Sequence, residues 1–149
     1  YPNGPSSVHN FGSDELIDFA DAIDANLLIT VNVGHGSAEL AANWVKYLNQ
    51  QKSQNVTWWE IGNELYMDGD LSGAELNARE YAAEFKKFAS AMKSVDSSIK
   101  LGAIGGLNYG RYAFIKDSDF LSILFSAVMN FLSNFLNLVS MSKSSLVKF

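Results

Sequence analysis

Apolar residues in the first part of the chain follow a helical spacing and then an extended one. Residues 13–23 place apolar side chains every three or four positions after Ser13, which predicts an amphipathic helix capped by that serine. Residues 27–33 (LLITVNV) form a short branched, apolar run that predicts a buried parallel strand. Two glycines around His35 end this strand, and Ser37 can cap a second helix. The apolar face of that helix is formed by Leu40, Ala41, Trp44, Val45 and Leu48.

The same alternation continues to residue 104. Residues 56–62 (VTWWEIG) predict a second strand, and residues 99–104 predict a third. Between them, Ser72 and Glu75 match a capping box at the start of a long amphipathic helix. The apolar face of this helix comprises Tyr81, Phe85, Phe88, Met92 and Val95. Strands that alternate with helices are typical of right-handed βαβ units, so we expect an α/β fold with a parallel sheet.

The character of the chain changes after residue 110. Residues 120–141 contain no charged side chain, and a stretch of that length can cross a bilayer. Serine and asparagine recur within it every three or four positions, which favours an apolar helix packed on the sheet over a membrane span. We therefore divide the chain into residues 1–110, which form the sheet, and residues 111–149, a divergent helical tail. Two alternatives for this tail remain: it associates with a membrane, or it is not native coding sequence.

Composition narrows the classes of function. The chain has 149 residues, 48% of them hydrophobic, which suits a single domain with a core. Its net charge is −5 and no basic stripe is present, which argues against a nucleic-acid partner. The absence of cysteine excludes disulfides, thiol catalysis and cysteine-ligated metal sites. The glycines between residues 102 and 110 are not followed by a helix, so we expect no dinucleotide cofactor and no metal.

The start of the chain bears on its origin. It begins with Tyr1, and no pattern of a signal peptide follows. We therefore expect that the chain is processed or cut from a longer one. The triplet Asn55-Val56-Thr57 is an N-glycosylation sequon, which lends weak support to a secreted, extracellular location.

Candidate chemistry gathers where the predicted strands end. Asn63 and Glu64 close the second strand, and parallel strands present functional groups at their carboxyl ends. Taken alone, a glutamate after a strand is more often a solvated loop acid, so the assignment depends on the residues around it. Further candidates for ligand binding share the expected rim, with ordinary loop or packing roles as the alternative: Asn32, His35, Tyr66, Asn108 and Tyr109.

Three side chains inside the second strand invite structural interpretations. Trp58 and Trp59 point to opposite faces, so at least one of them should lie in the core. Glu60 lies in the strand interior, where a buried carboxylate needs a partner. We interpret Glu60 as a buried, hydrogen-bonded structural acid and not as a second catalytic group.

The segment WWEIGNELY resembles the fourth-strand motif of clan A glycoside hydrolases. In that motif the glutamate is the general acid/base and the asparagine binds the sugar 2-hydroxyl, roles that the resemblance assigns to Glu64 and Asn63. Residues 29–49 are similar to the third strand and helix of family 51 α-L-arabinofuranosidases, and residues 95–106 resemble the approach to their fifth strand. The likeness covers about residues 11–110.

This resemblance implies a partial (β/α)8 TIM barrel and a retaining glycoside hydrolase that acts on plant-type oligo- or polysaccharide. Such enzymes use two carboxyl groups about 5–5.5 Å apart. A complete barrel takes about 250 residues, and the family's nucleophile belongs to a seventh strand that this chain does not reach. We therefore expect the remaining barrel segments to come from a longer chain and the isolated chain to be nearly inactive. A non-catalytic carbohydrate-binding fragment and a membrane-associated fragment are the alternatives.

Overall fold

The computed structural model describes residues 10–66 and 73–104. Its elements in chain order are α1 (Ser13–Ala22), β1 (Leu28–Val31), α2 (Ala38–Val45), the π-helical turn η1 (Lys46–Gln51), β2 (Trp58–Ile61), α4 (Ala78–Val95) and β3 (Lys100–Ala103). The order of helices and strands is the one that the sequence predicts. The predicted helix within residues 120–141 lies outside the described residues, as do Asn108 and Tyr109.

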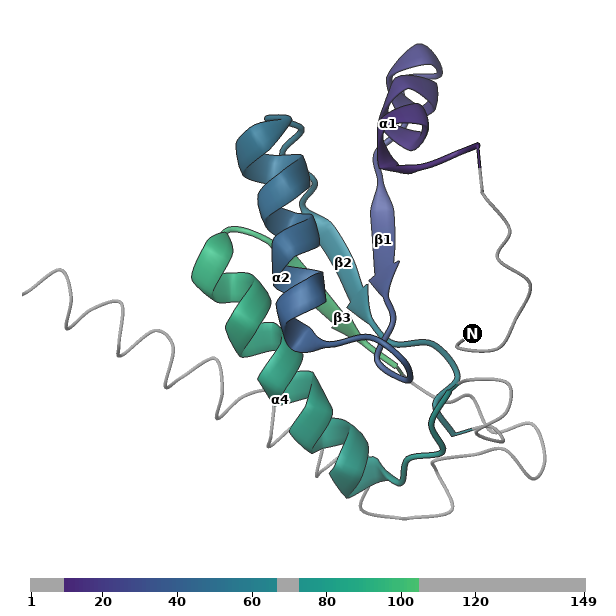
Figure 1. Cartoon of the computed structure of the whole chain (residues 1–149), viewed down its shortest axis with the longest axis vertical. Coiled ribbons are helices and arrows are strands. Elements are labelled where there is room, and N and C mark those ends of the chain that lie inside the picture. Colours follow the sequence, from purple (N-terminus) through teal and green to yellow (C-terminus); the bar gives the residue numbers. More distant parts are fainter. Residues whose placement is uncertain (1–9, 67–72, 105–149) are drawn as a thin grey trace, which may run out of the picture.

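The three strands form one parallel sheet in the order β1-β2-β3 (Figure 1). Their register places Thr30, Glu60 and Gly102 in one row across the sheet. The expected parallel sheet is therefore confirmed, and the strands end together at one edge. Functional groups that follow β1, β2 and β3 meet at that edge.

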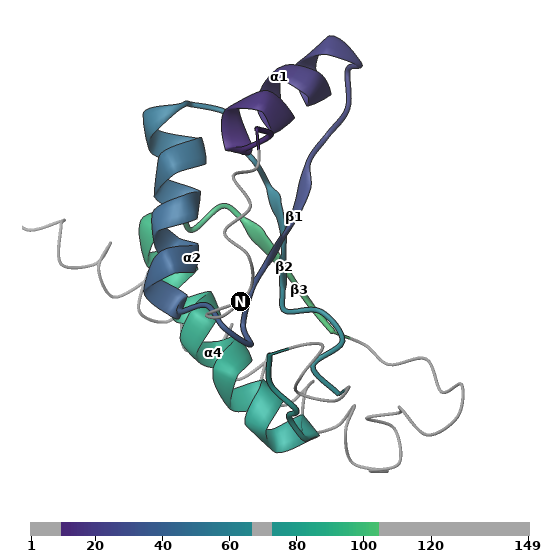
Figure 2. The same ribbon diagram turned by 45° about the vertical axis from the view of Figure 1, so that its right-hand side comes forward.

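One face of the sheet is covered and forms the core. Helices α2 and α4 both lie on that face, as the two ribbon views show (Figures 1 and 2). Alternate strand residues point into it, among them Val31, Trp59 and Ile61, each at most 1% exposed. The Trp44 ring of α2 meets Trp59 edge-on, with 5.8 Å between ring centroids. Burial of this apolar surface is the main source of stability for the described part of the chain.

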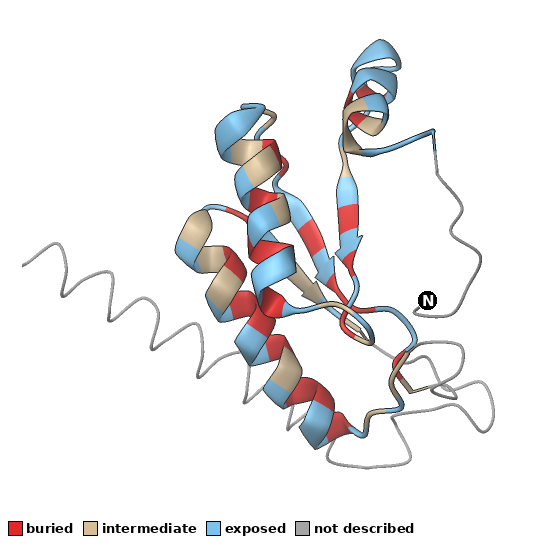
Figure 3. Ribbon diagram, in the orientation of Figure 1, coloured by how far each residue is buried: buried red, intermediate tan, exposed pale blue. Residues whose placement is uncertain are grey.

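No described helix covers the opposite face, and its residues alternate with the buried ones (Figure 3). Leu28 is 59% exposed and Trp58 is 49% exposed. The Lys100 ammonium lies 4.6 Å from the centre of the Trp58 ring. The expectation that one of the two tryptophans lies in the core is therefore confirmed, and the residue is Trp59.

Glu60 lies on this same open face. It is exposed, so the prediction of a buried acid is wrong. Its neighbours Trp59 and Ile61 point into the core, so Glu60 points to the other face, which has no described layer above it. The expected hydrogen-bond partner is present, because the Thr30 hydroxyl donates to Glu60 Oε2 over 3.0 Å.

Two of the three predicted helix starts need correction. Ser37 does cap α2, since its Oγ accepts from the Leu40 N–H over 3.1 Å. Helix α1 instead has Gly12 at its N-cap, and the Glu15 carboxylate accepts from the Gly12 N–H over 2.8 Å. Ser13 is the first residue of the helix, which frees its hydroxyl for a tertiary contact.

The capping box of α4 also lies later than expected. The Asn77 side chain accepts from two helical N–H groups, and the Glu80 carboxylate accepts from the Asn77 N–H over 2.8 Å. Glu75 precedes the helix, so the prediction of a box at Ser72 and Glu75 is wrong; Ser72 itself lies outside the described residues. Both pairs have the spacing of a capping box, and the spacing alone does not choose between them.

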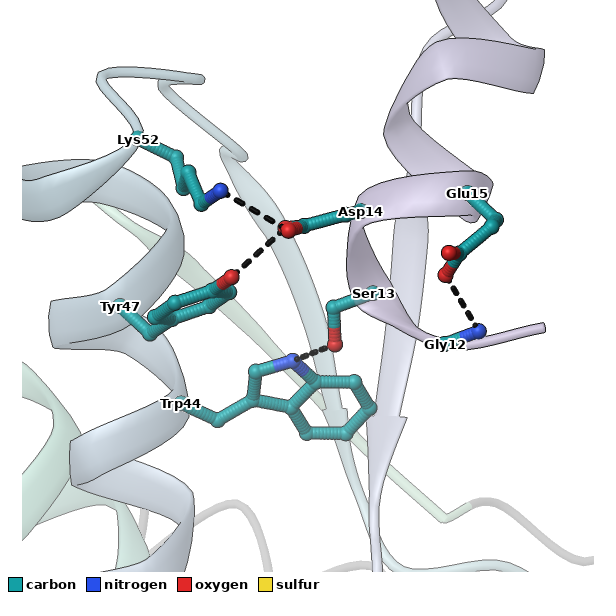
Figure 4. Close-up of polar contacts among 7 residues, drawn as sticks. All are labelled: Gly12, Ser13, Asp14, Glu15, Trp44, Tyr47 and Lys52. Atoms are coloured by element: carbon teal, nitrogen blue, oxygen red, sulfur yellow. Dashed lines mark hydrogen bonds and ion pairs between the residues drawn. The ribbon is translucent and has the colours of Figure 1, made fainter. Parts of the chain in front are cut away.

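Helix α1 is attached to α2 and η1 by a polar cluster (Figure 4). The Trp44 Nε1–H donates to Ser13 Oγ over 3.0 Å. Asp14 accepts from the Tyr47 hydroxyl over 2.7 Å and from the Lys52 ammonium over 2.8 Å. The two buried residues of α1, Ile17 and Ala20, add apolar contacts. Asp14, which binds both Tyr47 and Lys52, therefore contributes to the docking of α1 together with this burial.

The first testable prediction concerns the effect of low pH on the docking of α1. The hydrogen bond from Lys52 and then that from Tyr47 hold the pKa of Asp14 below its usual value of 3.8. A carboxyl whose folded pKa is depressed stabilises the fold above its unfolded pKa, and that contribution is lost as the pH falls through the folded pKa. The Trp44 indole N–H resonance should therefore shift as the pH falls below about 4.

The matched control is Asp14→Asn, which keeps the shape of the side chain and removes its titration. In this variant the acid-dependent shift of the Trp44 resonance should be absent. An unchanged acid transition in Asp14→Asn would mean that another carboxyl controls the docking of α1.

Candidate functional site

The carboxyl end of β2 is shaped by a glycine with a left-handed backbone. Gly62 has a φ of 81°, and its N–H donates to the Val31 carbonyl of β1 over 3.0 Å. A Cβ at this position would lie 2.7 Å from Leu65 Cδ1 and 3.2 Å from Ile104 Cδ1. Only glycine combines this φ with so little space, so the chain can turn here while it stays bonded to β1.

Asn63 and Glu64 follow this turn, and both are exposed. In a regular strand, adjacent side chains point to opposite faces. Here Gly62 and then Glu64, whose φ is 49°, break the alternation. A left-handed backbone is uncommon for a residue other than glycine and is often found at functional sites. The alternation of side chains thus ends after β2, and the break comes from two positive φ angles.

Asn63 and Glu64 line the same pocket between the ends of β2 and β3. Its volume is about 240 Å³, and its lining consists of Glu60, Gly62, Asn63, Glu64, Tyr66, Ala103 and Ile104. The polar groups of this lining are two carboxylates, one amide and one phenol. Such a set can donate and accept hydrogen bonds with the hydroxyls of a sugar.

The candidates at the end of β1 lie at the same edge of the sheet, but they do not line this pocket. Asn32 Oδ1 accepts from the His35 N–H over 2.9 Å, so Asn32 stabilises the turn after β1. The His35 ring lies against the backbone of Gly73, where a side chain would overlap it. The structure thus brings Tyr66 together with Asn63 and Glu64 in one pocket, whereas His35 lies against Gly73.

Two residues of the site region went unrecognised in the sequence. Glu60 lines the pocket beside Glu64. Tyr81 is fully buried on α4, donates its hydroxyl to the Ile61 carbonyl over 2.8 Å and accepts from the Ile104 N–H over 2.8 Å. Burial raises the pKa of Tyr81 above its usual value of 10.0, so the hydroxyl keeps its proton at neutral pH. Its helical spacing identified Tyr81 only as a core residue.

Within residues 10–66 and 73–104, no helix is long and apolar enough to cross a membrane. The same ranges hold no group of three side chains suited to a metal ion.

Comparison with known proteins shows which proteins this chain resembles in sequence and in fold. No protein-family model matches the chain. A probable α-L-arabinofuranosidase C from Aspergillus fumigatus is 26% identical over 111 residues, which cover 64% of this chain and 22% of that protein. An intracellular exo-α-(1→5)-L-arabinofuranosidase from Halalkalibacterium halodurans is 29% identical over 118 residues, which cover 69% of this chain and 23% of the relative.

Solved structures agree with these relatives. The α-L-arabinofuranosidase from Thermotoga maritima, solved as an arabinose complex, matches 64% of this chain with a TM-score of 0.57 and 32% identity. A family 51 α-L-arabinofuranosidase from Bifidobacterium longum shares the fold with a TM-score of 0.63 at 20% identity. The chain is thus similar, over part of its length, to α-L-arabinofuranosidases, and the solved structures that it resembles include members of family 51. It spans about a quarter of the length of the proteins that it matches, 23% and 26% for these two structures.

The second testable prediction concerns the turn after β2. Gly62→Ala should destabilise the fold by about 1–3 kcal/mol, because alanine is strained at positive φ and its Cβ meets Leu65. Urea unfolding followed by tryptophan fluorescence measures this change. Gly102→Ala is the matched control, since its Cβ would meet the flexible Glu60 side chain at 3.2 Å. Equal losses in the two variants would contradict a special role for the Gly62 backbone.

Proposed function

We propose that this chain carries the acid/base part of a retaining glycoside hydrolase site of the arabinofuranosidase type. Glu64 is the general acid/base, and Asn63 binds the sugar 2-hydroxyl. The observation that supports this most directly is that two adjacent residues, Asn63 and Glu64, line one pocket at the end of a parallel strand. A regular strand would separate them, and the two roles require that both reach one sugar ring.

In the first step, the Glu64 carboxyl donates its proton to the glycosidic oxygen as the bond from that oxygen to the anomeric carbon breaks. A second carboxylate attacks the anomeric carbon. In the second step, Glu64 takes a proton from water, and the resulting hydroxide displaces the enzyme carboxylate. Asn63 donates from its amide to the 2-hydroxyl, a contact that strengthens as positive charge develops on the ring.

The second carboxylate is not assigned to a described residue. Glu60 is the other carboxylate of the pocket, and its Oε2 accepts the Thr30 hydroxyl within the sheet. We propose that the nucleophile comes from the remaining barrel segments of a longer chain, which would pack on the open face of the sheet. The isolated chain then binds sugar but turns it over slowly, so carbohydrate binding without turnover is the second candidate function.

The proposed substrate is a terminal arabinofuranosyl unit of a plant-type oligo- or polysaccharide. The relatives in the comparison are named as α-L-arabinofuranosidases. The pocket volume of about 240 Å³ lies below the range of about 300–1,000 Å³ typical of sites for drug-sized ligands, which suits a single pentose ring. We include an extracellular location in this proposal on the basis of the sequon at Asn55.

The third testable prediction is binding of L-arabinose. Titration into the ¹⁵N-labelled chain should shift the amide signals of Asn63, Glu64 and Tyr66. Asn63→Ala should weaken binding about tenfold, because it removes one hydrogen bond of about 1.4 kcal/mol. Asn26→Ala, at the amino end of β1, is the control and should not change the affinity. Signal changes confined to the second pocket, lined by Asn26 and Asn55, would contradict the proposed site.

The fourth testable prediction isolates the acid role. Azide can replace the missing nucleophile, because it attacks the anomeric carbon and gives a glycosyl azide and a phenol. With azide present, Glu64→Gln should slow release of phenol from phenyl α-L-arabinofuranoside by about 10²–10⁴-fold, the usual contribution of a general acid. Release of dinitrophenol, which leaves without a proton, should change little.

The control for this experiment is Glu39→Gln on α2, an exposed carboxylate that does not line the pocket. It should behave as the unmodified chain does with both substrates. Equal losses for the two substrates in Glu64→Gln would contradict the role of Glu64 as proton donor.

A further inference from the structure

The hydrogen bonds between β2 and β3 follow a regular parallel pattern until the carboxyl end of the sheet. The Lys100 N–H donates to the Thr57 carbonyl over 2.7 Å. In a parallel pair, every second residue of one strand donates to the partner in this way. The register therefore leads to a bond from the Ile104 N–H to the Ile61 carbonyl.

The hydroxyl of Tyr81 occupies this position instead. The Ile104 N–H donates to Tyr81 Oη over 2.8 Å, and Tyr81 Oη donates to the Ile61 carbonyl over 2.8 Å. One side-chain hydroxyl thus accepts from the Ile104 N–H and donates to the Ile61 carbonyl, so both backbone groups are satisfied through the hydroxyl. Because burial raises the pKa of Tyr81, the hydroxyl retains the proton that it donates.

The inserted hydroxyl affects only the edge of β2 that faces β3. On the other edge the Gly62 N–H still donates directly to the Val31 carbonyl of β1 over 3.0 Å. The pocket that contains Asn63 and Glu64 is lined by the end of β2 and by Ala103 and Ile104 at the end of β3. The hydroxyl therefore lies between the two strands directly before the residues that line the pocket.

We propose that Tyr81 is a positioning residue, whose hydroxyl holds β2 and β3 apart and thereby sets the place of Asn63 and Glu64. The role in sugar binding rests on the proposed function of the pocket. The hydroxyl is separable from the ring, because the ring packs in the core against Phe85, with 6.3 Å between ring centroids. Phenylalanine can fill the same space, but it cannot bridge Ile61 and Ile104.

The test compares Tyr81→Phe with Tyr47→Phe in the full chain. The hydroxyl of Tyr47 donates to Asp14 of α1, away from the pocket. Tyr47→Phe removes this hydrogen bond and is therefore the control for the loss of a tyrosine hydroxyl elsewhere in the fold. The first readout is the affinity for L-arabinose. Tyr81→Phe should lower it about tenfold, the effect expected if the displaced Asn63 loses one hydrogen bond to the sugar, and Tyr47→Phe should not lower it.

The second readout is independent of sugar. It is the scalar coupling between Ile104 N and the Ile61 carbonyl carbon, which is observed only where a direct hydrogen bond joins the two groups. This coupling should be absent in the unmodified chain and should appear in Tyr81→Phe. The amide signals of Asn63 and Glu64 should also shift in that variant. A direct coupling in the unmodified chain overturns the proposal, and this measurement stands even if Tyr81→Phe does not fold.

The outcomes separate the two proposals. If the unmodified chain binds no arabinose, the proposed function fails, while the coupling and the shifts of residues 62–66 still decide the role of Tyr81. If Tyr81→Phe binds arabinose as well as the unmodified chain does, or leaves the shifts of residues 62–66 unchanged, Tyr81 is not a positioning residue.

Discussion

The alternation of side chains along a strand is the constraint on which this structure depends. It directs Trp59 and Ile61 into the core beneath α2 and α4, where they are at most 1% exposed. Continued for three more residues, it would place Asn63 and Glu64 on opposite faces. The left-handed backbone at Gly62 and Glu64 ends the alternation, so that both side chains reach one pocket. The buried strand thus supplies rigidity, and the turn supplies the site.

The same alternation leaves the other sheet face open. Leu28 and Trp58 are among its exposed apolar residues. In a closed barrel this face points inward and is filled by side chains from all strands. The described sheet has three strands, and the chain matches about a quarter of its structural relatives. The open face therefore suits the proposal that further segments complete both the barrel and the pair of carboxylates.

Most of the fold was predictable because it follows from periodicity, whereas the errors arose where periodicity carries no information. The spacing of a capping box occurs at Ser72 as well as at Asn77, and in the structure it is Asn77 that caps α4. Strand parity identified the face of Glu60, but not whether that face is covered. Within the site, a motif pointed to Asn63 and Glu64. The hydroxyl of Tyr81 bridges residues far away in the chain, and nothing in its helical spacing indicates that contact.

A crystal structure with a bound non-hydrolysable aryl thio-α-L-arabinofuranoside tests the central claim most directly, because it shows both side chains against one ring. The account predicts that the Asn63 amide lies within hydrogen-bond distance of the 2-hydroxyl and that the Glu64 carboxyl faces the sulfur that replaces the glycosidic oxygen. A sugar bound elsewhere, or bound with Asn63 and Glu64 on opposite sides of the β2 backbone, would contradict it.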